Sequence, residues 1–205
     1  MDDLVLVGAG GHARSCIDVI EQNGKFRIFG LLDKNVKPGE KILGYPVVGD
    51  DEMLEVVRAS CGMAIVTVGQ IKNSLNRAAL YQKIRGVKFV LPTIVSPSAT
   101  VSKNSTVGAG TMVMHNAQVS VGCMIGDNCI VNNRALIDHD SIVGDHCHIS
   151  TGAILNGNAE VGERCFIGSG AIIHQNVVIG DNCIIGAGVV VQGDVKPESV
   201  LRHHE

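Results

Sequence analysis

The sequence predicts two parts: an α/β, Rossmann-like N-terminal half domain and an all-β, left-handed parallel β-helix built from hexapeptide repeats. Two observations predict them. A strand, a glycine turn and a helical pattern follow one another near the N-terminus, and an aliphatic residue recurs every six positions from Val95 to Val191. We expect the first part to span residues 1–91, the β-helix residues 92–196, and a C-terminal tail residues 197–205.

The first part alternates apolar runs with helical patterns, which is typical of a parallel sheet covered by helices. The expected strands are residues 4–7, 27–32 and 63–68, and the expected helices are residues 13–22, 51–59 and 73–85. Residues 87–91 then lead through Pro92 and Pro97 into the first coil.

The turn from Gly8 to Ala13 joins a strand to a helix, which is where backbone N–H groups hold phosphates. Gly8, Gly10 and Ala13 fit the dinucleotide fingerprint, and Asp33 is placed for a ribose hydroxyl. The first part is about half of a full dinucleotide fold, which favours a nucleotide or nucleotide sugar over a nicotinamide cofactor. A purely structural glycine turn remains an alternative.

The period of six is unbroken over seventeen positions, and all of them are Val, Ile or Leu. The residue four places later is nearly always small, and Gly often follows the aliphatic position directly. Three six-residue edges close one triangular coil, and coils stack by parallel pairing. The aliphatic residues are therefore expected to line a narrow interior of five to six coils.

Four of the seven cysteines are spaced by 18 residues, so one inward column should contain Cys129, Cys147, Cys165 and Cys183. Small buried filler is the favoured interpretation. Zinc or disulfide bonds are the alternative.

Composition excludes several functions. The chain has 205 residues, a net charge of −3 and no run of basic residues, which argues against nucleic acid. It has no apolar stretch of 18 residues and no basic leader, so we expect a cytoplasmic protein without a membrane span. No histidine or carboxylate cluster has the spacing of a metal site, and no metal is expected.

His139 is the strongest candidate for chemistry because it lies in Asp138-His139-Asp140, where a carboxylate can orient an imidazole. Gly157 follows one coil later and offers a bare backbone N–H beside that histidine, as an oxyanion donor would. A solvated polar corner is the alternative. His148 lies one edge further round and either contacts a ligand or faces water.

The order of these parts resembles the family of sialic acid O-acetyltransferases and UDP-amino-sugar N-acetyltransferases over nearly the whole chain. Ile137-Asp138-His139-Asp140 is similar to the family's segment around its catalytic base. The resemblance implies that His139 is the base, that Asp140 orients it, and that Asn132 belongs to the catalytic residues. It also implies an oxyanion role for Gly157.

The same resemblance implies acetyl-CoA as co-substrate and a nucleotide sugar as acceptor. His148, Gly157, Ser169 and Ala187 would lie along acetyl-CoA. The nucleotide sugar would contact the glycine turn and the residues around it, namely Gly10, Gly11, His12, Asp33, Lys34 and Gly69. The chain departs from the family in having Lys34 after Asp33, where the family has a second acid, and in lacking its usual C-terminal tail.

The sequence therefore predicts an acetyl-CoA-dependent N-acetyltransferase that acts on the amine of a UDP-linked amino-deoxy sugar by direct transfer. A homotrimer with its sites between subunits is expected. Three alternatives remain: O-acetylation of a sialic acid or another sugar, a noncatalytic nucleotide-binding scaffold, and a metal-dependent hydratase of the prism type.

Overall fold

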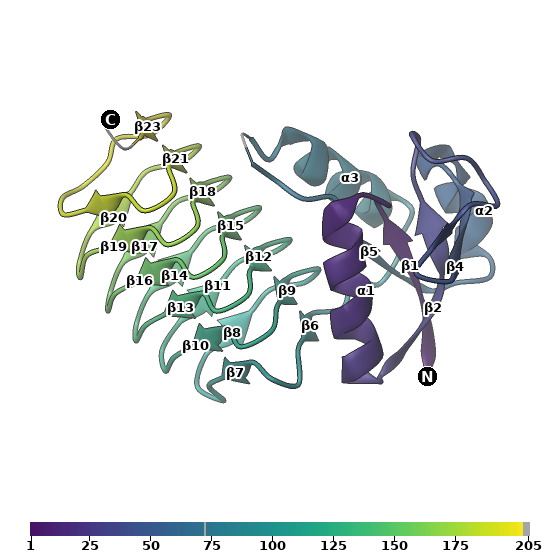
Figure 1. Cartoon of the computed structure of the whole chain (residues 1–205), viewed down its shortest axis with the longest axis horizontal. Helices are drawn as coiled ribbons and strands as arrows, with labels where there is room; N and C mark the ends of the chain where they lie inside the picture. The colour runs from purple at the N-terminus through teal and green to yellow at the C-terminus, as the bar shows by residue number, and fades with distance from the viewer. Residues whose placement is uncertain (72, 203–205) are drawn as a thin grey trace.

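The computed structural model describes residues 1–71 and 73–202, and it contains an α/β part followed by a left-handed parallel β-helix (Figure 1). The α/β part has one five-stranded sheet with the order β3-β4-β2-β1-β5, in which β1 is parallel to both β2 and β5. Its strands are β1 (Asp2–Val7), β2 (Phe26–Leu32), β3 (Lys41–Ile42), β4 (Tyr45–Gly49) and β5 (Met63–Val66).

Helices cover both faces of this sheet because successive residues of β1 point to opposite sides. Leu4 and Leu6 pack in the cluster that contains α1 (Gly11–Asn23). Val5 and Val7 pack in the opposite cluster with α2 (Leu54–Arg58) and α3 (Leu75–Gly86). None of the helices in the described residues is long and apolar enough to cross a bilayer.

The α/β part differs from the sequence prediction in three places. The helix expected over residues 51–59 is a 3₁₀ turn, η1 (Asp51–Met53), followed by the short α2. The strand expected over residues 63–68 ends at Val66, and β3 and β4 form an antiparallel pair that was not expected. The pair was missed because its hydrophobic run is too short for a period to be recognised.

The β-helix confirms the hexapeptide prediction, since each aliphatic position of the repeat is the second residue of a two-residue strand. Face 1 consists of β6 (Ile94–Val95), β9 (Met112–Val113), β12 (Ile130–Val131), β15 (His148–Ile149), β18 (Phe166–Ile167), β21 (Ile184–Ile185) and β23 (Val200–Leu201). Face 2 consists of β7 (Thr100–Val101), β10 (Gln118–Val119), β13 (Leu136–Ile137), β16 (Ile154–Leu155), β19 (Ile172–Ile173) and β22 (Val190–Val191). Face 3 consists of β8 (Thr106–Val107), β11 (Met124–Ile125), β14 (Ile142–Val143), β17 (Glu160–Val161) and β20 (Val178–Ile179).

The interior of the β-helix is one aliphatic cluster that includes the column of Cys129, Cys147, Cys165 and Cys183. All four thiols are free and buried, which confirms their expected role as small filler. Their Sγ atoms donate hydrogen bonds to backbone carbonyl oxygens.

Three corners connect the faces, and we number them in chain order. The first corner joins face 1 to face 2, the second joins face 2 to face 3, and the third joins face 3 to face 1. Left-handed backbone recurs at these corners, mostly at Asn and Gly, which tolerate positive φ best.

The α/β part packs on the outer side of face 1, beside the first coils (Figure 1). Ile94, Met112 and Ile130 point outward from successive strands and are buried in the cluster that contains α1. His148 is the next residue in this outward column, because it pairs with Ile130 across the ladder. Face 1 therefore carries His148 to the edge of the contact between the two parts.

The end of the chain adds one more strand to face 1. β23 pairs with β21, so the stack extends into the segment that we expected to form a tail. His203, His204 and Glu205 lie outside the described residues.

Candidate active site

A cavity of about 630 Å³ opens between the glycine turn and the β-helix. It is lined by all six residues that were expected to contact a nucleotide sugar, namely Gly10, Gly11, His12, Asp33, Lys34 and Gly69. His148 of face 1 also lines it. The cavity therefore lies against both parts of the chain.

The glycine turn needs glycine for steric reasons at its first position. Gly8 has φ of +121°, and a Cβ atom there would lie 2.6 Å from the Val68 side chain. Gly10 is the residue before α1, and no side chain caps the helix. Gly11 and His12, the first residues of α1, line the cavity. The N–H groups at this end of a helix suit an anion because the helix dipole is positive there.

Asp33 closes the turn from the neighbouring strand. One of its carboxylate oxygens accepts a 2.7 Å hydrogen bond from the Ala9 N–H, and the other accepts a 2.7 Å bond from the Asn35 N–H. Each oxygen retains a further lone pair for a ligand hydroxyl. Lys34 follows directly and adds positive charge to the cavity wall.

Both ring nitrogens of His148 have hydrogen-bond partners. Its Nδ1 lies 2.7 Å from the Gln70 carbonyl oxygen, which can only accept, so Nδ1 carries the proton. Its Nε2 accepts a 3.0 Å hydrogen bond from Asn132 Nδ2. Burial lowers the pKa of His148 to about 4. The ring is therefore neutral with a fixed tautomer.

His12 lies at the start of α1, and its ring centroid is 6.4 Å from that of His148. Burial, aided by the charge of Arg77, lowers the pKa of His12 to about 3. Its Nε2 is buried and has no hydrogen-bond partner among the described residues. A ligand in the cavity would meet an uncharged His12 imidazole whose Nε2 is available for a hydrogen bond.

Arg77 was not singled out from the sequence, yet it is buried and bridges the two parts of the chain. Its guanidinium is buried and donates to the Val68 carbonyl oxygen at 2.6 Å and to the Asn128 carbonyl oxygen at 2.9 Å. It thus ties α3 and the loop after β5 to the third corner. The sequence contained one indication that Arg77 is buried. It is spaced by four and seven residues from Tyr81 and Ile84, and the three form the buried side of α3.

The pair His139 and Asp140 lies on the second corner. His139 Nδ1 is 2.9 Å from Asp140 Oδ2, so the carboxylate accepts the ring proton and Nε2 keeps its lone pair. The hydrogen bond to Asp140 is the main cause that raises the pKa of His139, followed by the charge of Asp138. The His139 side chain is 50% exposed, so a substrate can reach it.

Gly157 lies against the His139 ring. A Cβ atom at Gly157 would be only 2.5 Å from His139 Nε2, so any other residue would displace the imidazole. Its N–H donates no backbone hydrogen bond within residues 1–71 and 73–202. An imidazole and a backbone N–H that donates no backbone hydrogen bond in the described residues therefore lie side by side on the second corner.

The structure separates two groups of the expected catalytic residues. Asn132 lies with His148 near the first corner, whereas His139, Asp140 and Gly157 lie on the second corner. Within one chain the second corner contributes no residue to the cavity.

Ser169 and Ala187 lie on the first corner, whose side chains become smaller in the later coils. Ser169 Oγ is 3.0 Å from Ser150 Oγ. The neighbouring column contains Gly152 and Gly170, which have φ of +66° and +65° and nothing within 4 Å of an added Cβ. A strip of exposed backbone therefore leads along the coils toward Ser150 and the His148 end of the cavity. We call it the glycine strip.

Within the described part of the chain, no group of three or more His, Cys, Asp or Glu side chains is arranged to hold a metal ion.

The parallel β-helix and its bare corner define a hexapeptide-repeat transferase, and the family comparison supports this class. The PglD N-terminal domain matches residues 3–84, and the bacterial transferase hexapeptide repeat matches residues 158–193. A histidine variant of perosamine N-acetyltransferase from Caulobacter crescentus, solved with CoA and GDP-perosamine, is 33% identical. The match covers 98% of this chain and 93% of that one, with a TM-score of 0.92. The chain belongs to this family of sugar N-acetyltransferases.

Two further relatives agree. The acetyltransferase domain of PglB from Neisseria gonorrhoeae, in complex with acetyl coenzyme A, is 32% identical over 97% of this chain and 94% of that one, with a TM-score of 0.90. UDP-N-acetylbacillosamine N-acetyltransferase of Bacillus subtilis is 30% identical over 117 residues, which is 56% of this chain. That match spans about half of the relative's own length, 52%.

Proposed function

We propose that this protein transfers the acetyl group of acetyl-CoA to the amine of a nucleotide-linked amino-deoxy sugar. The observation that carries the proposal is the cavity, where the glycine turn meets His148 of the β-helix. A nucleotide site and an acyltransferase scaffold thereby share one space. The relatives solved with GDP-perosamine and with acetyl-CoA support both ligand classes.

The nucleotide part would occupy the glycine turn. The diphosphate would meet the N–H groups that begin α1 and the ammonium of Lys34, both of which favour an anion. Asp33 would accept a hydrogen bond from a ribose hydroxyl with its remaining lone pairs. The sugar would extend toward His12 and His148, which are neutral and can contact hydroxyls without attracting a second anion.

Acetyl-CoA would lie along the glycine strip. Its pantetheine chain would run over Gly170 and Gly152, where no side chain blocks it, and would contact the backbone near Ser169 and Ala187. The thioester would then reach the first corner beside Asn132 and His148. In the single chain Ser169, Gly170 and Ala187 are exposed, so acetyl-CoA can enter from the end of the β-helix.

The chemistry requires one base and one oxyanion donor. His139 Nε2 would take a proton from the amine while the nitrogen attacks the thioester carbonyl carbon. The Gly157 N–H would stabilise the oxyanion of the tetrahedral intermediate. The carbon–sulfur bond then breaks, and the imidazolium returns the proton to the departing thiolate, giving CoA and the N-acetylated sugar.

The cavity and His139 lie at different corners of one chain, so we propose that each site uses two copies. A neighbouring β-helix would bring its second corner against the first corner and the cavity of this one. Closed threefold symmetry would repeat that contact three times, which suits a homotrimer. A cytoplasmic location is proposed as well, because all seven cysteines are unpaired thiols.

Acetyl transfer to a panel of acceptors tests the proposal. Thiol release from acetyl-CoA would be followed with UDP-linked and GDP-linked amino sugars, the matching hydroxyl sugars, and free sialic acids. Turnover confined to an amino sugar supports N-acetylation. The nucleotide whose sugar gives the higher kcat/KM identifies the preferred nucleobase, uracil or guanine. Turnover only with a sialic acid would replace the proposal by O-acetylation. Binding of nucleotide sugar without any turnover would favour a scaffold.

A further inference from the structure

A second glycine lies against the His139 and Asp140 pair, in the coil below. Gly122 lies on the second corner, one coil before Asp140, and has φ of +76°. A Cβ atom built there would overlap Asp140 Oδ1 and would lie 3.2 Å from Asp140 Cγ. The Asp140 carboxylate therefore occupies the space that a side chain at position 122 would fill.

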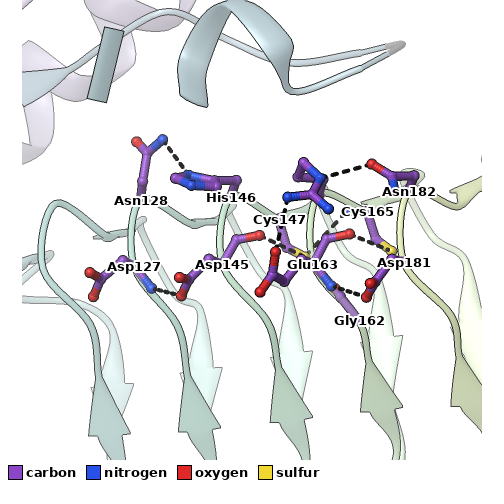
Figure 2. Close-up of polar contacts among 11 residues, drawn as sticks. Asp127, Asn128, Asp145, His146, Cys147, Gly162, Glu163, Cys165, Asp181 and Asn182 are labelled. Atoms are coloured by element: carbon purple, nitrogen blue, oxygen red, sulfur yellow. Dashed lines mark hydrogen bonds and ion pairs between the residues drawn. The ribbon is translucent and has the colours of Figure 1, made fainter. Parts of the chain in front are cut away.

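At the third corner, two carboxylates likewise lie over glycines of the preceding coil, Asp145 over Gly126 and Asp181 over Gly162. There Asp145 Oδ1 accepts a hydrogen bond of 2.7 Å from the Asp127 N–H, and Asp181 Oδ1 accepts one of 2.8 Å from the Glu163 N–H (Figure 2). Each carboxylate lies over a glycine of the preceding coil and is anchored by a backbone donor.

Asp140 lacks such an anchor. The only hydrogen bond of its carboxylate within the described residues is that between Oδ2 and His139 Nδ1. Its side chain is 64% exposed, so water surrounds much of it. The carboxylate is thus oriented by its bond to His139 and lies in the space that Gly122 leaves unfilled.

We propose that Gly122 is a positioning residue of this enzyme: its missing side chain lets the Asp140 carboxylate lie where it holds His139 Nδ1. The inference rests on the proposed role of His139 as the base. Gly157 leaves room for the imidazole from the coil above, and Gly122 leaves room for its partner from the coil below.

The alanine variant Gly122→Ala tests this inference, although an added side chain is strained at a φ of +76°. Its closest clash is with the end of a side chain that can rotate into solvent. Gly24→Ala is the matched control, because Gly24 has φ of +68° and nothing within 4 Å of an added Cβ. It carries the same backbone strain and displaces no carboxylate.

Two readouts are needed. NMR titration of the His139 ring should show its pKa falling toward the ordinary value in Gly122→Ala, as in Asp140→Ala, and unchanged in Gly24→Ala. The kcat/KM for acetyl transfer should fall about ten- to a hundredfold in Gly122→Ala, since small misplacements of a reacting group have effects of this size. In the Asp140→Ala background, adding Gly122→Ala should change kcat/KM less than about threefold.

The proposal would be overturned if His139 in Gly122→Ala kept the pKa that it has in the wild type. It would also be overturned if Gly122→Ala lowered kcat/KM as much in the Asp140→Ala background as it does alone. If Gly122→Ala does not fold, Gly122→Asn replaces it, because Asn tolerates positive φ and still fills the space. The titration of His139 requires no turnover. It therefore tests Gly122 even if the proposed acetyl transfer fails.

Discussion

Asn132 Nδ2 donates a 3.0 Å hydrogen bond to His148 Nε2. This bond links the first corner of the β-helix to His148, which lines the cavity between the two parts of the chain. His148 Nδ1 is already occupied by the Gln70 carbonyl oxygen. The ring is therefore held from both sides in its neutral form.

Replacing Asn132 by Asp should reverse the polarity of that bond. A carboxylate cannot donate to His148 Nε2 and favours the imidazolium, so the pKa of His148 should rise above its value of about 4. At pH values below the raised pKa, we expect kcat/KM to fall about tenfold because the neutral ring is lost beside the thioester. NMR titration of His148 checks the first point. Asn104→Asp, at an exposed corner, is the control, and a ring that stays neutral at pH 5 in Asn132→Asp would contradict the account.

Filling the glycine strip should weaken acetyl-CoA binding and leave the chemistry intact. Gly170→Asn keeps the left-handed backbone but places a side chain on the strip. The KM for acetyl-CoA should rise about tenfold with kcat nearly unchanged, as expected for the loss of uniform binding. Gly24→Asn adds the same residue at a similar φ outside the strip and should leave KM unchanged. Equal KM values in the two variants would place acetyl-CoA elsewhere.

Stability should fall with acid because His12 and His148 are buried and neutral. Their pKa values of about 3 and about 4 lie below the unfolded value of 6.5, so the unfolded state binds more protons as the pH falls below 6.5. Each histidine then lowers the free energy of unfolding by about 1.4 kcal/mol per pH unit down to its folded pKa. In urea titrations from pH 7 to pH 5, the slope of the free energy of unfolding against pH should rise toward two protons near pH 5, and toward one proton in His148→Asn. A flat profile in both proteins would show that these rings are not buried in the folded state.

Much of this site was predictable from sequence because the hexapeptide register is periodic. Once Ile137 and Leu155 are placed in the interior, His139 and Gly157 must lie beside each other one coil apart. The glycine turn was equally direct, since a strand followed by Gly8 and Gly10 indicates an anion site before any fold is known. These predictions depend on local spacing alone.

The contacts between the two parts were not predictable in the same way. The bond between the Gln70 carbonyl oxygen and His148 joins residues 78 positions apart, and that from Arg77 to Asn128 joins residues 51 positions apart. Both depend on how the α/β part packs on the β-helix, which no local period encodes. His148 was therefore identified as a candidate, while its partner and protonation state required the structure.

Mixed oligomers should recover activity if each site uses two copies. His139→Ala removes the base but keeps the cavity, whereas Gly11→Trp fills the cavity but keeps the base. Each variant alone should be inactive. Unfolding and refolding them together should restore about a quarter of wild-type activity, because random assembly pairs an intact cavity with an intact base at that frequency. If refolded mixed oligomers of the wild-type size recovered no activity, each site would be formed by one chain alone.

The most direct test of the central claim is thiol release from acetyl-CoA with a nucleotide-linked amino sugar, comparing wild type with His139→Ala. The account predicts turnover by the wild type and a loss of about a hundredfold or more in kcat for the variant, with nucleotide-sugar binding unchanged. Equal turnover by the two proteins would contradict the assignment of His139 as the base.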